Sequence, residues 1–148
     1  MSSFINELRE KSTKADNIKN EIVAEIKHDF DKYLNSEQLE SYLRRRIGDT
    51  EIKERKVFMR VEFCEYHDGC TTTNFHCGGH TWYNPAVKDG WESRKYNGIE
   101  LKTINEEVCN YLCHRLTSRM NELGFHVASK DKQHSRFGYC NVHFYFGW

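Results

Sequence analysis

Apolar residues near the start of the chain recur every three or four positions, which is the spacing of one helix face. The stripe consists of Phe4, Leu8, Ala15, Ile18, Ile22, Ile26, Phe30 and Tyr33. From Phe4 to Ile22 the steps alternate between four and three, a heptad pattern with Lys11 as its one polar member. A helix of about thirty residues measures about 45 Å. We expect residues 1–34 either to break near Ser12-Thr13 and lie on the domain, or to project and self-associate through residues 4–33.

Two further helices and a strand follow from the same kind of pattern. Ser36 precedes a stretch with helical spacing that ends at Gly48, and Thr103 precedes another that ends at Gly124. Between them, Val57, Met59, Val61 and Phe63 alternate with polar residues, as in a half-buried strand. These segments predict helices before and after a strand.

The strand after residue 57 is expected to turn tightly. Asp68-Gly69 is a typical two-residue hairpin turn, and it would return the chain through Thr71–Thr73 with Thr73 opposite Cys64. Residues 80–98 read as a long aromatic loop, and such loops are more often functional than idle.

Two strands close the chain, over residues 125–130 and 138–146. In the last one, Cys140, Val142, Phe144 and Phe146 share one face, and Tyr139, Asn141, His143 and Tyr145 share the other. The whole pattern predicts a single α+β domain over residues 1–148, with the α+β core over 35–148. We expect an antiparallel sheet of about four to five strands, helices packed on one face, and the order ααββαββ.

Composition narrows the class of protein. The chain has 148 residues, and 22 basic side chains balance 22 acidic ones, so no charge excess favours nonspecific binding to nucleic acid or anionic membranes. Its apolar runs are too short to span a bilayer and the first twenty residues hold no signal-like segment. The six cysteines then read as reduced thiols. We expect a cytoplasmic protein with no membrane partner.

A metal site is the most specific chemistry that the residues suggest. His67, Cys70, Cys77 and His80 form two pairs at the spacing of zinc knuckles, and zinc prefers thiolate and imidazole ligands. A straight hairpin would separate these pairs by about 20 Å at 3.3 Å per residue. The zinc hypothesis and the hairpin prediction therefore exclude each other. We favour the hairpin and expect no resident cofactor, with zinc as the alternative.

Enzymatic patterns are few. Cys77 and His80 form the one close pair of nucleophile and base, without a third group to orient them. His126 and His143 lie on neighbouring final strands and could act as acid and base in a small nuclease. Cys109 and Cys113 are four apart on a helix and are expected to pack as small hydrophobes. The sequence leans against an enzyme.

Binding functions fit the residues better. Trp82, Tyr83, Trp91, Arg94 and Tyr96 are the residue types that dominate protein interfaces, so a protein partner is the leading hypothesis. The runner-up is a nucleic-acid-binding module in which Tyr139, His143 and Tyr145 stack on bases. The general character is similar to that of small accessory or inhibitor proteins of phages and mobile elements, although no motif identifies a family.

Overall fold

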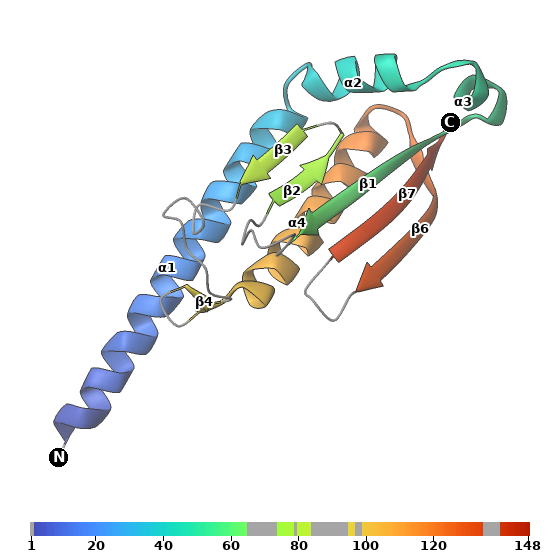
Figure 1. The fold of residues 1–148 in the computed structure, drawn as a ribbon. Coiled ribbons are helices and arrows are strands. Elements are labelled where there is room, and N and C mark those ends of the chain that lie inside the picture. The colour runs from blue at the N-terminus through green and yellow to red at the C-terminus, as the bar shows by residue number, and fades with distance from the viewer. Residues whose placement is uncertain (1, 65–73, 79, 84–94, 97–98, 135–139) are drawn as a thin grey trace.

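The computed structural model describes residues 2–64, 74–78, 80–83, 95–96, 99–134 and 140–148, with side chains described for 3–62, 77–78, 106–132 and 141–148. Its elements are α1 (Ser2–Leu34), α2 (Gln38–Arg46), α3 (Asp49–Glu54), β1 (Lys56–Cys64), β2 (Asn74–Cys77), β3 (His80–Tyr83), β4 (Lys95–Tyr96), β5 (Ile99–Glu100), α4 (Leu101–Glu122), β6 (His126–His134) and β7 (Cys140–Gly147). Figure 1 shows their arrangement.

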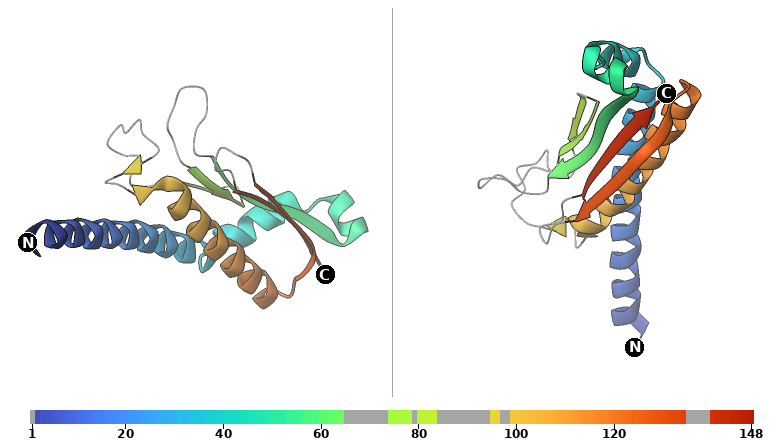
Figure 2. Two further views of the ribbon diagram at one scale, coloured as in Figure 1. Left: turned by 90° about the horizontal axis from the view of Figure 1, so that it is seen from below. Right: turned by 90° about the vertical axis from the view of Figure 1, so that its right-hand side faces the viewer.

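The main sheet has the strand order β3-β2-β1-β7-β6, and every neighbouring pair is antiparallel. The two long helices, α1 and α4, cross the same face of this sheet, as the two views in Figure 2 show. The prediction of an α+β fold with an antiparallel sheet is therefore confirmed. The order of elements differs, because the short helix α3 was not predicted and β3 forms within a segment expected to be a loop.

The core lies between the sheet and the two long helices. Its largest fully buried side chains are Phe30 and Leu34 of α1, Leu39 of α2, Met59 of β1, Leu112, Leu116 and Met120 of α4, and Phe144 and Phe146 of β7. The buried residues Val57, Met59 and Val61 of β1, like the buried residues of β7, are alternate residues, because successive side chains of a strand point to opposite faces. The predicted inward face of the last strand is confirmed for Val142, Phe144 and Phe146.

Polar contacts fix the two long helices to each other. The Tyr111 hydroxyl donates to Asp31 Oδ2 at 2.6 Å, and Arg115 Nε donates to Asp31 Oδ1 at 2.9 Å. Arg119 Nε donates to the carbonyl oxygen of Leu34, at the end of α1, at 2.9 Å. These contacts hold the C-terminal half of α1 beside α4 and on the same side of the sheet.

Helix α1 is continuous over 33 residues, so the predicted break near Ser12-Thr13 is wrong. Its C-terminal half packs on the body, while its N-terminal half extends past the sheet (Figures 1 and 2). Phe4 and Leu8 are correspondingly 65% and 44% exposed. The helix therefore projects, which was one of the two outcomes expected from its length.

The pairing of β1 with β2 is shifted by one residue from the predicted register. Cys64 lies opposite Asn74, not Thr73, and Val61 lies opposite Cys77. Directly opposed residues share a face, so this register places Cys77 on the buried face with Val61. Cys77 is 2% exposed. The expected turn at Asp68-Gly69 lies outside the described residues.

The cysteines differ from the expectation of reduced thiols. Cys109 is disulfide-bonded, and its partner is neither Cys77 nor Cys113, both of which are free. Cys109 and Cys113 are buried on α4, which agrees with the expectation that both side chains pack in the core. Among the described helices, none has a stretch long and apolar enough to cross a membrane.

Candidate functional site

The face of the sheet opposite the helices carries a group of aromatic side chains. Tyr145 and His143 alternate with the buried residues of β7, and the register places them opposite Phe58 and Arg60 of β1. The two strands are neighbours in the middle of the sheet. Because α1 and α4 both lie on the other side, no described helix covers these residues (Figure 2).

Phe58, His143 and Tyr145 form one contiguous group, which we call the aromatic strip. The ring centres of Phe58 and His143 are 5.2 Å apart in an edge-on arrangement. Those of Phe58 and Tyr145 are 5.3 Å apart and tilted by 55°. Tyr145 is 40% exposed, while Phe58 and His143 are partly buried. The Phe58 ring therefore contacts both of the others on this face, and Tyr145 is the most exposed of the three.

Two basic side chains flank the aromatic strip. Lys56 Nζ lies 5.3 Å from the centre of the Tyr145 ring, which is the geometry of a cation–π contact. Arg60 Nε lies 3.2 Å from Glu62 Oε2, and the Arg60 side chain is 57% exposed. The strip therefore has positive charge at its edge, and one of its two cations is partly neutralised.

Asn141 extends the same row by one position. Residues 141, 143 and 145 alternate with buried residues and so share the open face. The Oδ1 atom of Asn141 is buried and accepts no hydrogen bond from the described part of the chain. A buried acceptor without a donor costs free energy.

Sequence reasoning found part of this site. His143 and Tyr145 were predicted, and the structure places both on the open face, while Tyr139 lies outside the described residues. Phe58 was missed because it occupies a nominally polar position of β1. The sequence could have revealed it, because Phe58 is an aromatic residue in a row of alternate positions whose next members, Arg60 and Glu62, are charged.

The residues of the predicted protein-binding loop are not brought together by described contacts. Trp82 and Tyr83 are backbone positions of β3, at the edge of the main sheet. Tyr96 is a backbone position of β4, in a separate two-stranded sheet. Trp91 and Arg94 lie outside the described residues.

Of the four predicted zinc ligands, Cys77 is the one whose side chain the structure describes. Cys77 is in the core, and burial raises the pKa of its thiol. Zinc binds the thiolate, so a zinc ion at Cys77 would have to displace the thiol proton. His80 lies opposite Cys77 in the pairing of β2 and β3, and His67 and Cys70 fall outside the described residues. No metal-binding cluster of acidic, His and Cys side chains occurs among the side chains described, and zinc stays a prediction.

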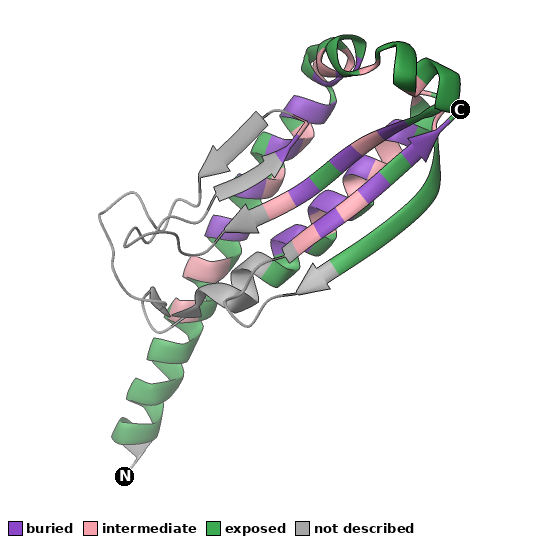
Figure 3. Cartoon of the chain, turned by 45° about the vertical axis from the view of Figure 1, so that its right-hand side comes forward, coloured by how far each residue is buried: buried purple, intermediate pink, exposed green. Residues whose placement is uncertain are grey.

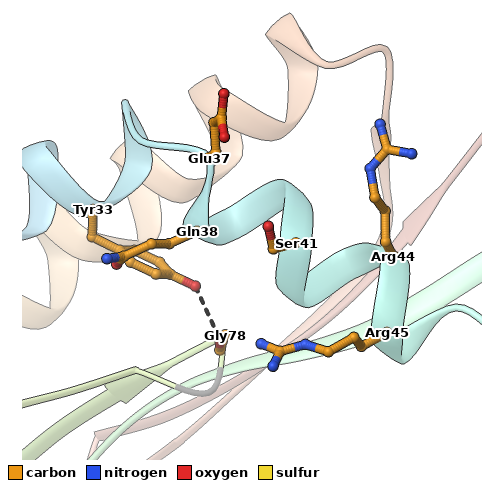
Figure 4. A pocket seen from close by; sticks show the side chains of 7 residues that line it. All are labelled: Tyr33, Glu37, Gln38, Ser41, Arg44, Arg45 and Gly78. Carbon is orange, nitrogen blue, oxygen red and sulfur yellow. Dashed lines mark hydrogen bonds between the residues drawn. The ribbon is translucent and has the colours of Figure 1, made fainter.

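A cleft of about 560 Å³ lies between the end of α1, α2 and the end of β2. It is lined by Tyr33, Glu37, Gln38, Ser41, Arg44, Arg45 and Gly78. Figure 4 shows Arg45 extended toward Gly78 and Arg44 pointing away from it. Because only one of the two guanidinium groups in the lining points toward Gly78 and a carboxylate shares the lining, this cleft is a weak candidate for an anion site.

The two histidines of the nuclease hypothesis lie at different heights on the sheet. His126 is opposite Gly147, and His143 is four residues away along β7. Four residues of a strand span about 13 Å. An acid and a base must both reach the atoms of one bond, within about 3 Å of the protons they move. This separation argues against the pair acting together on one bond.

No protein-family model, curated protein sequence or solved structure matches this chain. The fold and the candidate site alone define it as an α+β protein with helices on one face of an antiparallel sheet and an aromatic strip on the other.

Proposed function

We propose that this protein is a non-enzymatic binding protein that holds single-stranded nucleic acid on the open face of its sheet. The observation that carries the proposal is the aromatic strip. Its rings come from two neighbouring central strands and lie on the face that α1 and α4 leave free. The ring centre of Phe58 is 5.2 Å from that of His143 and 5.3 Å from that of Tyr145. Single-stranded bases bind to sheets of this kind by stacking on exposed aromatic side chains.

The charge around the strip sets the kind of binding that we expect. Each base stacked on an aromatic ring contributes about 1–3 kcal/mol by alanine substitution. Lys56 and Arg60 are the cations beside the strip, and Arg60 is paired with Glu62. Stacking should therefore supply most of the affinity. With two phosphates neutralised, the slope of log K against log salt should be about −1.4 for a single strand.

Fluorescence anisotropy with labelled 12-mers of RNA and DNA would test the proposal. Tyr145→Ala should weaken binding by about 5- to 150-fold, which is the stacking contribution of one base. Tyr145→Phe keeps the ring and should retain most of the affinity. Ile52→Ala is a control, because Ile52 is an exposed apolar residue on α3 that is not part of the strip.

Three results would contradict the proposal. They are the absence of binding at about 100 µM protein, equal affinity of Tyr145→Ala and the unaltered protein, and a tighter complex with duplex than with single strands. Binding that depends on Arg44 and Arg45 instead of Tyr145 would place the nucleic acid at the α2 cleft.

A protein partner is the second candidate, and the position of β3 favours it. This strand is at the edge of the main sheet and contains Trp82 and Tyr83. Edge strands can bind an extended peptide as an added strand, with side-chain contacts giving specificity. The double variant Trp91→Ala/Arg94→Ala should abolish capture of such a partner while the fold is retained. Unchanged capture would exclude Trp91 and Arg94 as contact residues.

A further inference from the structure

The projecting half of α1 continues the apolar face that the other half buries. Ile22, Ile26 and Phe30 are 7%, 2% and 0% exposed against the body. Phe4 and Leu8 belong to the same stripe of three- and four-residue steps, so they lie on the same side of the straight helix. They are exposed, and Figure 3 shows the change from exposed to buried along α1.

We propose that a second copy of this chain covers the exposed stripe, with the two α1 helices antiparallel over residues 4–15. The proposal concerns self-association and is independent of the proposed nucleic-acid site. Ile5, at 45% exposure, widens the apolar surface next to Phe4 and Leu8. Such a stripe at heptad spacing is the seam by which helices pair.

The position of the body decides the direction of the pair. Ala15 and Ile18, the next stripe residues after Lys11, already pack against the core. The body therefore occupies the seam side of α1 from about Ala15 onward. In a parallel pair, two bodies would have to occupy the space between the same helix segments. In an antiparallel pair, each body lies beyond the N-terminus of the other helix, and only residues 4–15 overlap.

Charges beside the seam favour the same direction. In the antiparallel pair, Phe4 lies opposite Ala15 of the second copy, and Leu8 lies opposite Lys11. Beside this seam, Glu7 then faces Lys14 of the second copy. The twofold symmetry of the dimer produces this contact twice. A parallel pair would instead place Lys11 against Lys11 and Lys14 against Lys19. Lys19 also has a partner within its own chain, Glu107, at 3.2 Å.

The overlap is short, which sets the expected affinity. Residues 4–15 cover about 18 Å of helix at 1.5 Å per residue. Stable interfaces bury about 1,200–2,000 Å² in total, and two helices of this length bury less. We therefore expect a reversible dimer with a dissociation constant in the range of about 10–500 µM.

Sedimentation equilibrium between about 5 and 500 µM protein tests the proposal. The unaltered chain should fit a monomer–dimer equilibrium, and Leu8→Glu should be monomeric throughout. Ile52→Glu places the same charge at another exposed apolar residue and should leave the dimer unchanged. All described residues from 3 to 14 are exposed, so these variants should keep the circular dichroism of the fold.

Charge variants distinguish the two directions. Lys14→Glu turns both Glu7 contacts repulsive and should weaken an antiparallel dimer about tenfold, and adding Glu7→Lys should restore it. In a parallel dimer, Lys14→Glu would face Lys19 and strengthen association. A stronger Lys14→Glu dimer, a dimer insensitive to Leu8→Glu, or a monomer at every concentration would overturn the proposal.

Discussion

Substituting Gly78 should reveal how tightly α1 is joined to the end of β2. Gly78 has a φ of +56°, in the left-handed region, and a Cβ there would lie 2.5 Å from the Tyr33 hydroxyl oxygen. The same hydroxyl donates a hydrogen bond of 2.8 Å to the Gly78 carbonyl. Because Tyr33 is 4% exposed, its ring cannot swing out to relieve the clash. Gly78→Ala must therefore displace the backbone or break the bond.

The size of the effect follows from two contributions. The left-handed conformation costs a non-glycine residue about 1–2 kcal/mol. A buried hydroxyl that loses its acceptor costs about 1–3 kcal/mol more. Gly78→Ala should thus lower the free energy of unfolding by about 2–5 kcal/mol. Gly124→Ala is the matched control, because Gly124 has a φ of +98° and no atom within 4 Å of the added Cβ. Gly124→Ala should lower the free energy of unfolding only by the cost of the left-handed backbone conformation, about 1–2 kcal/mol.

A double-mutant cycle in urea, read by circular dichroism at 25 °C, isolates the clash. Tyr33→Phe removes the hydroxyl and should cost about 1 kcal/mol for the lost hydrogen bond. In that background the added methyl group meets no oxygen, so Gly78→Ala should cost about 1–2 kcal/mol there. Equal costs of Gly78→Ala with and without the Tyr33 hydroxyl, or equal costs at Gly78 and Gly124, would refute this reasoning.

Two further predictions concern α4. Asp31→Asn should lower the free energy of unfolding by about 1–2 kcal/mol, because Tyr111 and Arg115 both donate to the Asp31 carboxylate. The control is Glu107→Gln, at the exposed contact with Lys19. It should change the free energy of unfolding by less than about 0.5 kcal/mol in the same urea assay. Stability should also fall above about pH 9, because burial raises the pKa of the Cys113 thiol from 9.0 to about 11 and the unfolded chain then releases its proton first. Unfolding measured from pH 7 to 10.5 should show a shallower decline in Cys113→Ala, and an equal decline in both proteins would contradict the assignment.

The sequence predicted the local elements well and their pairing less well. The stripe of α1 and the alternation of β7 are local patterns, because each residue's side follows from its own helix or strand. The register of β1 and β2 depends on the conformation of the connection between them, and a tight turn at Asp68-Gly69 implied Thr73 opposite Cys64. The observed partner is Asn74. This single-residue difference moves Cys77 from the open face to the core.

Phe58 shows why the candidate site was only partly visible. On β1 alone it is one aromatic residue among charged neighbours, and a lone exposed aromatic residue is ordinary. Phe58 becomes part of a site only through the pairing of β1 with β7, which brings it beside His143 and Tyr145, almost ninety positions later in the chain. No pattern within either strand specifies that pairing.

The open face is a consequence of where the two long helices lie. Asp31 ties α1 to α4 through Tyr111 and Arg115, so both helices are committed to the same side of the sheet. The opposite side is then expected to be mainly polar, since the buried apolar side chains of β1 and β7 point toward the helices. Phe58 and Tyr145 depart from that expectation, and their rings contact each other without reaching the core. As a directly opposed pair, Phe58 and Tyr145 stabilise the sheet, and under the proposal above the same rings provide the surface on which bases stack.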